Sequence, residues 1–411
     1  HVLVPIGKTR VPIVDGQYIY FGATLLALMP IFLYLKVSAV PAAPRTYLAV
    51  LLAGVFAFAA SAMAGLAPAY SLRLLAALVG TSLPFILIGW LIPLHAIRPV
   101  ILCLLLICIT PALGAALLQY FGPVHIGAVE LRNHLHAKSR WSFLFYQSND
   151  FGAIVVVAMI SAVYLAIEWR SNRWLSWGSV LCVAFLMVAY LNSNSRGALL
   201  WLIWAIGIYL VAGVALFRRC VHWSSVQWLA VSVIGMAAII GLLVFFDRTV
   251  ASFLRIYSLN LTASNLDRVT SMRWHIWREM LRQFGEHPVL GFGFGASGVL
   301  LKGQTPSSPL NVFLGTAGET GLAGLFPLLM LWVGGTIVVW RQIREAWGRG
   351  NELVNISLWL IALLGGLAWQ QMVEWDVLRI SFLNYLFFFL VSVAWTLKAK
   401  QIAPAPIKPD M

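Results

Sequence analysis

The sequence predicts an all-α fold, a polytopic bundle of transmembrane helices. Of its 411 residues, 61% are hydrophobic and only 10% are charged, and the mean hydropathy is +0.87. Lipid offers no hydrogen bonds to the backbone, so apolar runs of this kind must be helices rather than open strands. A helix needs about 20 apolar residues to cross a bilayer. Candidate spans lie near 17–36, 47–67, 73–93, 97–119, 150–167, 174–192, 197–216, 226–246, 317–340, 353–371 and 377–397.

Basic residues in alternate short loops predict the orientation of these spans. Such loops tend to stay in the cytoplasm. By this rule His1 lies outside, and an additional span before it would give about 12 helices with both ends cytoplasmic. The basic residues that mark the cytoplasmic side are Lys36, Arg45, Arg170, Arg173, Arg218, Arg219, Arg341, Arg344, Arg349, Lys398, Lys400 and Lys408.

The net charge of +14 also has a second source, on the opposite side of the predicted membrane. Two longer outer segments, near 120–149 and 247–309, are basic although they face away from the cytoplasm. An anionic ligand at the outer face explains this placement, and attraction to acidic lipid headgroups is the alternative. Their cationic or titratable residues are Arg132, His134, His136, Lys138, Arg140, Arg248, Arg255, Arg268, Arg273, Arg278, Arg282 and Lys302.

These segments define the expected domain organisation. Residues 1–246 form the N-terminal transmembrane helices, with the short outer segment near 120–149. Residues 247–309 form a helical outer loop, residues 310–400 the C-terminal transmembrane helices, and residues 401–411 a cytoplasmic tail.

Within the second outer loop, residues 268–286 have the periodicity of an amphipathic helix. Val269, Ile276, Trp277, Met280 and Phe284 share one apolar arc, and the charged residues fall on the opposite one. Arg273 projects from the apolar arc, where a guanidinium needs an anionic partner. The alternatives are an arginine that snorkels along its own stem and a structural ion pair.

A second arginine stands in the short outer turn of residues 191–197, between two spans. Asn and Ser favour turns, and Gly197 allows a tight entry into the next helix. Arg196 would begin that helix, where outward-facing N–H groups already favour an anion. Arginine also binds phosphate through two parallel hydrogen bonds.

The segment HPVLGFGFG, residues 287–295, follows the amphipathic helix. Pro288 ends that helix, and the alternating glycines allow close backbone approach. A further helix begins near Asn311 and contains Glu319, which is costly at the end of a span unless it is paired, and is therefore a candidate site residue. Gly321 and Gly324 are expected to serve close helix packing.

Taken together, these motifs resemble the O-antigen ligase and O-antigen polymerase superfamily. The resemblance covers about residues 140–330 and rests on SRGALL at 195–200, R-x-x-x-W from Arg273 to Trp277, HPVLGFGFG, and N-x9-G-x-x-G from Asn311. FYQSNDFGA, residues 145–153, is similar to an asparagine-containing segment that precedes a span in many members.

The resemblance implies a GT-C-type membrane glycosyltransferase in the bacterial inner membrane, with its active site facing the periplasm. It would transfer O-antigen glycan from undecaprenyl pyrophosphate to the lipid A core oligosaccharide and need no metal or cofactor. The alternatives are an O-antigen polymerase or protein O-oligosaccharyltransferase with the same donor, and a transporter or non-catalytic binder of lipid-linked glycan.

The expected site residues follow from these motifs. Arg196, Arg273 and Glu319 are the catalytic candidates. The substrate-binding candidates are the two arginines together with Asn311, Trp277, Asn149 and Arg140.

The chain departs from the family at one position. Members usually carry a histidine directly before the asparagine, as the presumed base on the acceptor hydroxyl, and here that position is Leu310. Glu319 lies on the same helix, His134 and His136 lie in the other outer loop, and His275 faces away from Arg273. Four alternatives stay open: the chain uses another base, its local alignment with the family is shifted, it is an inactivated variant, or the reaction needs little base assistance. The sequence also leaves open whether Trp174, Trp177, Trp201 and Trp204 line a groove for lipid, although interface anchoring is the preferred interpretation.

Overall fold

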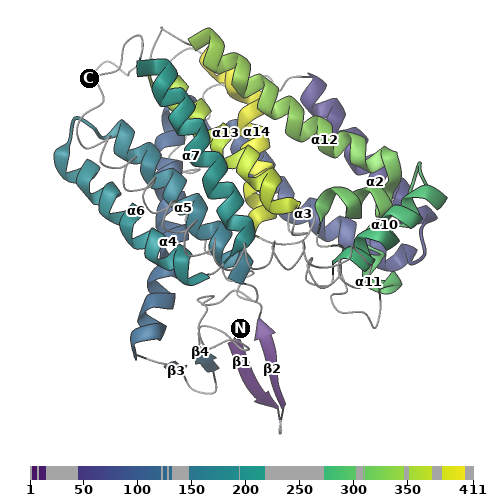
Figure 1. The fold of residues 1–411 in the computed structure, drawn as a ribbon. Coiled ribbons are helices and arrows are strands. Elements are labelled where there is room, and N and C mark those ends of the chain that lie inside the picture. Colours follow the sequence, from purple (N-terminus) through teal and green to yellow (C-terminus); the bar gives the residue numbers. More distant parts are fainter. Residues whose placement is uncertain are drawn as a thin grey trace, which may run out of the picture.

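A computed structural model describes residues 2–6, 9–14, 45–121, 124–126, 129–131, 148–193, 195–217, 273–301, 309, 311–346, 351–372 and 382–402. Most of these residues form a polytopic bundle of membrane helices, as predicted (Figure 1). The helices are α2 (Arg45–Ala64), α3 (Pro68–Leu91), η1 (Leu94–Ala96), α4 (Ile97–Phe121), α5 (Ser148–Glu168), α6 (Arg173–Ser193), α7 (Arg196–Phe217), α10 (Trp274–Glu286), α11 (Ser297–Leu300), α12 (Val312–Ala346), α13 (Asn351–Gln371) and α14 (Phe382–Ile402).

The predicted spans agree with these helices wherever the structure describes them. Among the described residues, seven helices are long and apolar enough to cross a membrane. Two shorter apolar segments, Gly197–Val211 within α7 and Leu383–Lys398 within α14, add to them. The predicted spans 17–36 and 226–246 lie outside the described residues. The protein is therefore a multi-pass membrane protein.

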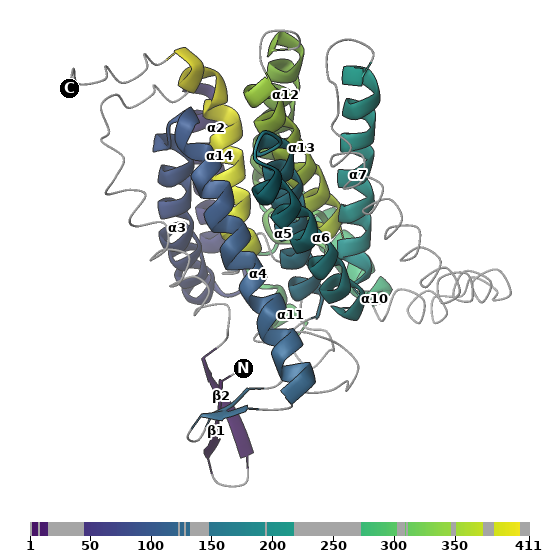
Figure 2. The ribbon, with the colours of Figure 1, turned by 90° about the vertical axis from the view of Figure 1, so that its left-hand side faces the viewer.

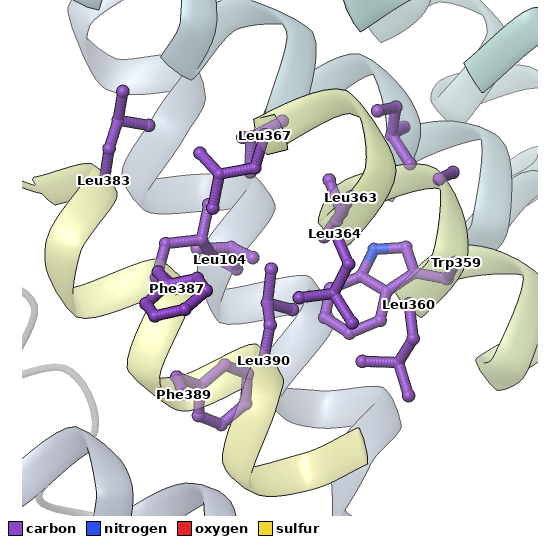
Figure 3. Close-up of a cluster of buried hydrophobic side chains, with 14 of the residues drawn as sticks. Leu104, Trp359, Leu360, Leu363, Leu364, Leu367, Leu383, Phe387, Phe389 and Leu390 are labelled. Carbon is purple, nitrogen blue, oxygen red and sulfur yellow. The ribbon is translucent and has the colours of Figure 1, made fainter. Parts of the chain in front are cut away.

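Helix α5 lies at the centre of the bundle and contacts α4, α6, α7 and α13. Of the apolar stretch of α5 that is long enough to cross a membrane, 94% is buried inside the bundle, as expected for a helix that is apolar on every side. The adjoining core forms where side chains of α4, α13 and α14 meet, among them Leu104, Trp359 and Phe387 (Figure 3). Helices far apart in the sequence also pack together, α2 against α12 and α3 against α14.

Tryptophan indoles join several neighbouring helices. Trp201 donates to the Ala362 carbonyl at 3.1 Å, and Trp204 donates to the Ile361 carbonyl at 3.2 Å. Trp201 is fully buried. The preferred interpretation of Trp201 as an interface anchor is therefore wrong, because its ring fits against Gly366 of α13 in the bundle interior. Trp174 and Trp177 are exposed, as an anchoring role requires.

Four short strands form a small sheet that the sequence analysis did not predict. β1 (Val2–Ile6), β2 (Thr9–Val14), β3 (Val124–Ile126) and β4 (Val129–Leu131) are antiparallel, in the order β2-β1-β4-β3. The sheet lies beyond the end of α4, on the side of the bundle where α10 and α11 also lie (Figure 2). This side, where α5, α7 and α12 begin and α13 ends, is called the site end below; the other is the opposite end.

Candidate functional site

The site end contains a break in helix α12 at Gly321, whose φ of 61° and ψ of −158° are not helical. A helix interrupted there loses the regular N–H to carbonyl bonds that span the break. Polar backbone groups inside a membrane protein must find other partners. The missing partners come from a segment about thirty residues earlier in the chain.

That segment is the glycine loop, residues 287–295. The amides of Phe292 and Gly293 donate to the Gly318 and Glu319 carbonyls at 3.1 and 2.9 Å. In the other direction, the amides of Leu322 and Ala323 donate to the carbonyls of Pro288 and Val289 at 2.8 and 3.0 Å. The loop therefore replaces the hydrogen bonds that the break removes.

Glycine is required at the closest point of this contact. Gly291 has a φ of 66°, and a Cβ there would lie 2.2 Å from the carbonyl carbon of Glu319. Gly321 has the same restriction, because its Cβ would lie 2.4 Å from the carbonyl carbon of Val289. The close backbone approach expected for the HPVLGFGFG glycines is confirmed. The expected packing role of Gly321 is realised against this loop rather than against a straight helix.

Glu319 holds the end of the same loop. Its side chain is buried, and its two carboxylate oxygens accept hydrogen bonds from the Gly295 amide at 2.8 Å and the Ser297 amide at 3.1 Å. Its backbone carbonyl also accepts from the Ser61 hydroxyl of α2, at 2.7 Å. A buried carboxylate is costly unless it is hydrogen-bonded, so these contacts stabilise one loop conformation. The catalytic role expected for Glu319 stays a prediction.

Helix α10 packs against the glycine loop through its apolar face. Ile276 and Met280 are fully buried and cluster with Phe292, Ala296 and Leu301. The amphipathic helix predicted for residues 268–286 is described from Trp274 onward, and residues 268–272 lie outside the described part.

The charged face of α10 points away from this contact. Arg282 is exposed and bonds Glu279 and Glu286, three and four residues away on the helix. The Arg282 hydrogen bond is the main cause that lowers the pKa of the Glu279 carboxyl below its usual value. The surface ion pairs and the buried apolar face together fix which side of α10 faces the bundle.

Arg273 occupies the N-cap position of α10 and is partly buried. Its carbonyl accepts the Trp277 amide at 2.9 Å, and the Trp277 indole donates to the Pro309 carbonyl at 3.1 Å. Pro309 directly precedes Leu310, which lies outside the described residues. The Arg273 end of α10 is thus tied to the segment that leads into α12.

Asn311 caps α12 and joins it to α13. Its side-chain oxygen accepts the Leu314 amide at 2.9 Å, as an N-cap residue does. Its side-chain nitrogen donates to the Met372 carbonyl, just after α13, at 2.9 Å. These bonds give Asn311 a structural role, and its substrate-binding role stays a prediction.

The Ser195-Arg196 turn lies beside the first turn of α5. The Ser195 hydroxyl accepts the Ala198 amide at 3.3 Å and so caps α7. A Cβ on Gly152 would lie 2.5 Å from the Ser195 Cβ, so Asn149, one turn before Gly152, lies close to the start of α7. Arg196 is the first residue of α7 as predicted; its side chain, and all of Arg140, lie outside the described part.

The structure thus brings Asn149, Arg273, Trp277, Asn311 and the backbone of Arg196 to one end of a single bundle. The helices involved contact one another: α5 with α7, α7 with α13, α13 with α12, and α12 with α10. Figure 1 shows α10 and α11 packed beside the beginning of α12 and the end of α2. This arrangement could hold an anionic ligand against the starts of several helices.

Two buried residues at this end were not predicted from the sequence. Gln370 and Gln371, the last two residues of α13, are both fully buried. The signal was available, because two adjacent amide side chains at the end of an apolar span are costly to bury and favour a functional interpretation.

Residues 181–329 match the family model described as O-antigen ligase. No curated protein matches the chain. The matched region runs from α6 to the middle of α12 and includes the Arg196 turn, α10, the glycine loop and the break at Gly321.

Proposed function

We propose that this chain is a membrane glycosyltransferase, an O-antigen ligase, and the match of residues 181–329 to the O-antigen ligase family model supports this. The donor is O-antigen glycan on undecaprenyl pyrophosphate, and the acceptor is the lipid A core oligosaccharide. The observation that carries this proposal is the position of Arg273, at the start of a helix whose buried face is fixed by the glycine loop.

An acceptor hydroxyl oxygen forms a bond to the anomeric carbon of the donor sugar as the bond from that carbon to the diphosphate breaks, and the hydroxyl proton passes to the released diphosphate or to water. Negative charge then develops on the departing oxygens. Arg273 and Arg196, held in a partly dehydrated site, stabilise that charge more in the transition state than in the ground state. The start of α7 adds backbone N–H groups beside Arg196. Since guanidinium groups take the place of a divalent cation, the proposed chemistry needs no metal or cofactor.

Glu319 acts as a positioning residue in this proposal. Its carboxylate oxygens bond the amides of Gly295 and Ser297, so they are engaged in holding the loop. The loop in turn packs Phe292 against Ile276 and Met280 of α10, the helix that begins beside Arg273. Through these contacts Glu319 fixes the position of α10, and with it the position of Arg273 in the site.

The site end faces the periplasm in this proposal. The opposite end carries Arg170, Arg173, Arg341, Arg344 and Lys398, and basic loops favour the cytoplasmic side. The lipid-linked donor and the lipid A core would then both reach the site from the outer leaflet of the inner membrane.

Transfer from purified carrier-linked glycan to lipid A core tests the proposal. Arg196→Ala and Arg273→Ala are each expected to lose nearly all transfer. Leu310→His is expected to be unchanged if another group already serves as the base, and faster by up to about 10²–10⁴ if none does. Full activity of either alanine variant would contradict the assigned roles. Transfer onto a second carrier-linked glycan, with none onto lipid A core, would identify a polymerase instead.

A further inference from the structure

Gln370 is a buried polar side chain without a hydrogen-bond partner among the described residues. It is 0% exposed, and among the residues that the structure describes neither its Oε1 nor its Nε2 has a hydrogen-bond partner. Buried amides are rarely left in this state, because each lost hydrogen bond destabilises the fold.

The position of Gln370 is fixed by its neighbours on α13 and α7. Gly366 packs directly on the Trp201 ring, and Trp201 donates to the Ala362 carbonyl at 3.1 Å. Gln370 follows Gly366 by four residues and so shares the face of α13 that is directed at α7.

The two helices run antiparallel, since Gly366 meets Trp201 while Gly365 meets Trp204. One turn from Gly366 towards the site end therefore corresponds to one turn from Trp201 towards the start of α7, where Gly197 and Arg196 lie. Two residues beyond Gln370, the Met372 carbonyl accepts the Asn311 side chain. Gln370 thus lies in the layer that contains the starts of α7 and α12.

The chemistry of the amide restricts the ligand. Gln370 offers two N–H donors and one carbonyl acceptor. A phosphate oxygen satisfies only the donors, and Oε1 would stay without a partner. A hydroxyl group both donates and accepts, so it is able to satisfy Nε2 and Oε1 together.

We propose that Gln370 binds a hydroxyl of the sugar attached to the diphosphate of the donor, next to the Arg196 end of α7. This inference rests on the proposed function and deepens it. In this proposal Gln370 determines which donor sugar is accepted, because it binds one hydroxyl of that sugar. The arginines bind the diphosphate that every such donor carries.

A panel of donors that each lack one hydroxyl of that sugar tests the inference. In the wild type, the donor that lacks the hydroxyl bound by Gln370 is expected to lose about 5- to 150-fold in kcat/KM, since the missing hydroxyl leaves the buried amide unsatisfied. In Gln370→Met, which keeps the length but not the hydrogen bonds, the ratio between the natural and that deoxy donor should fall to about one. A purely structural role would lower both rates and keep the ratio.

Gln342→Met is the matched control. Gln342 is a buried glutamine near the opposite end of α12, and its Oε1 also has no partner among the described residues. Its substitution should leave both the rate and the donor ratio unchanged. Thermal unfolding gives a second measurement: Gln370→Met is expected to be at least as stable as the wild type, because it removes an unsatisfied buried amide.

The outcomes separate the two proposals. Wild-type protein that transfers all deoxy donors equally, or a Gln370→Met variant that keeps the wild-type ratio, overturns the role of Gln370 and leaves the ligase proposal standing. A marked loss of thermal stability in Gln370→Met also overturns it, since the amide then has an internal partner. Wild-type protein that transfers no glycan at all overturns the proposed function, and this inference with it.

Discussion

Buried acidic side chains have different hydrogen-bond donors at the two ends of the bundle. At the opposite end, Glu168 of α5 accepts from Arg98 at 2.6 Å and from Asn355 at 2.8 Å, and Glu352 lies 3.6 Å from Arg98. At the site end, the carboxylate of Glu319 accepts from backbone amides of the glycine loop. The first arrangement joins side chains of three helices, whereas the second shapes a loop.

The two kinds of donor give the carboxylates different roles, one in helix packing and the other in the support of the candidate site. An ion-pair network between helices fixes how the helices pack, and its charges compensate one another. A carboxylate that binds backbone amides fixes the path of the chain instead, and here that chain supports the helix that begins beside Arg273. Substitutions at the opposite end should therefore change stability, and those at the site end should change activity as well.

The largest effect is expected from Gly291→Ala. Its φ of 66° disfavours any other residue, and the new Cβ would lie 2.2 Å from the Glu319 carbonyl carbon. The loop could no longer pair with the broken turn of α12, so both folded yield and transfer should be lost. Gly298→Ala is the control, since a Cβ there meets nothing within 4 Å. Folded yield is measured by size-exclusion chromatography in detergent, and a normal, active Gly291→Ala protein would contradict the required contact.

Arg273→Ala should lower kcat by about 10²–10³, the usual effect of removing one group that stabilises developing negative charge. Arg282→Ala is the control on the same helix, because Arg282 is exposed and bonds Glu279 and Glu286. Its kcat should equal that of the wild type. Equal losses in the two variants would mean that α10 contributes only general positive charge.

Glu319→Gln and Glu168→Gln compare the two ends directly. Either change should lower stability, by about 1–3 kcal/mol, because hydrogen bonds to a buried carboxylate are weakened. Glu319→Gln should also reduce kcat, since an amide nitrogen would face a backbone N–H of Gly295 or Ser297 and loosen the loop. Glu168→Gln should keep the wild-type kcat per folded molecule. Thermal unfolding with active-site titration measures both quantities, and equal kcat losses would erase the distinction between the ends.

The smallest effect concerns the Glu279 and Arg282 pair on the surface of α10. Hydrogen bonding from Arg282 lowers the pKa of Glu279, so the folded state binds this proton less readily than the unfolded state. The resulting stability is present above the unfolded pKa of about 4.3 and is lost as the pH falls through the folded value. Thermal unfolding between pH 7 and pH 3 should show a slightly shallower acid loss in Arg282→Ala. An identical pH profile would mean that the pair contributes nothing to stability.

Much of this site was predictable because its signals are local. The apolar face of α10 and the start of α7 at Arg196 each depend on residues near one another in the sequence. The glycine pattern likewise indicated a close backbone approach, although it did not indicate which segment the loop approaches. The small sheet and the buried position of Trp201 were missed because each depends on a distant partner, β4 for β1 and Gly366 for Trp201.

The sequence by itself determined the membrane class and the position of the described spans, since hydropathy patterns act over one or two helical turns. Only the tertiary structure decided which partners Glu319 and Asn311 have and that Gln370 is buried without one among the described residues. Glu319 accepts from Gly295, and Asn311 donates to Met372, in each case across a large separation in sequence. Such contacts depend on how whole helices pack, and no local pattern specifies which buried polar groups will find a partner.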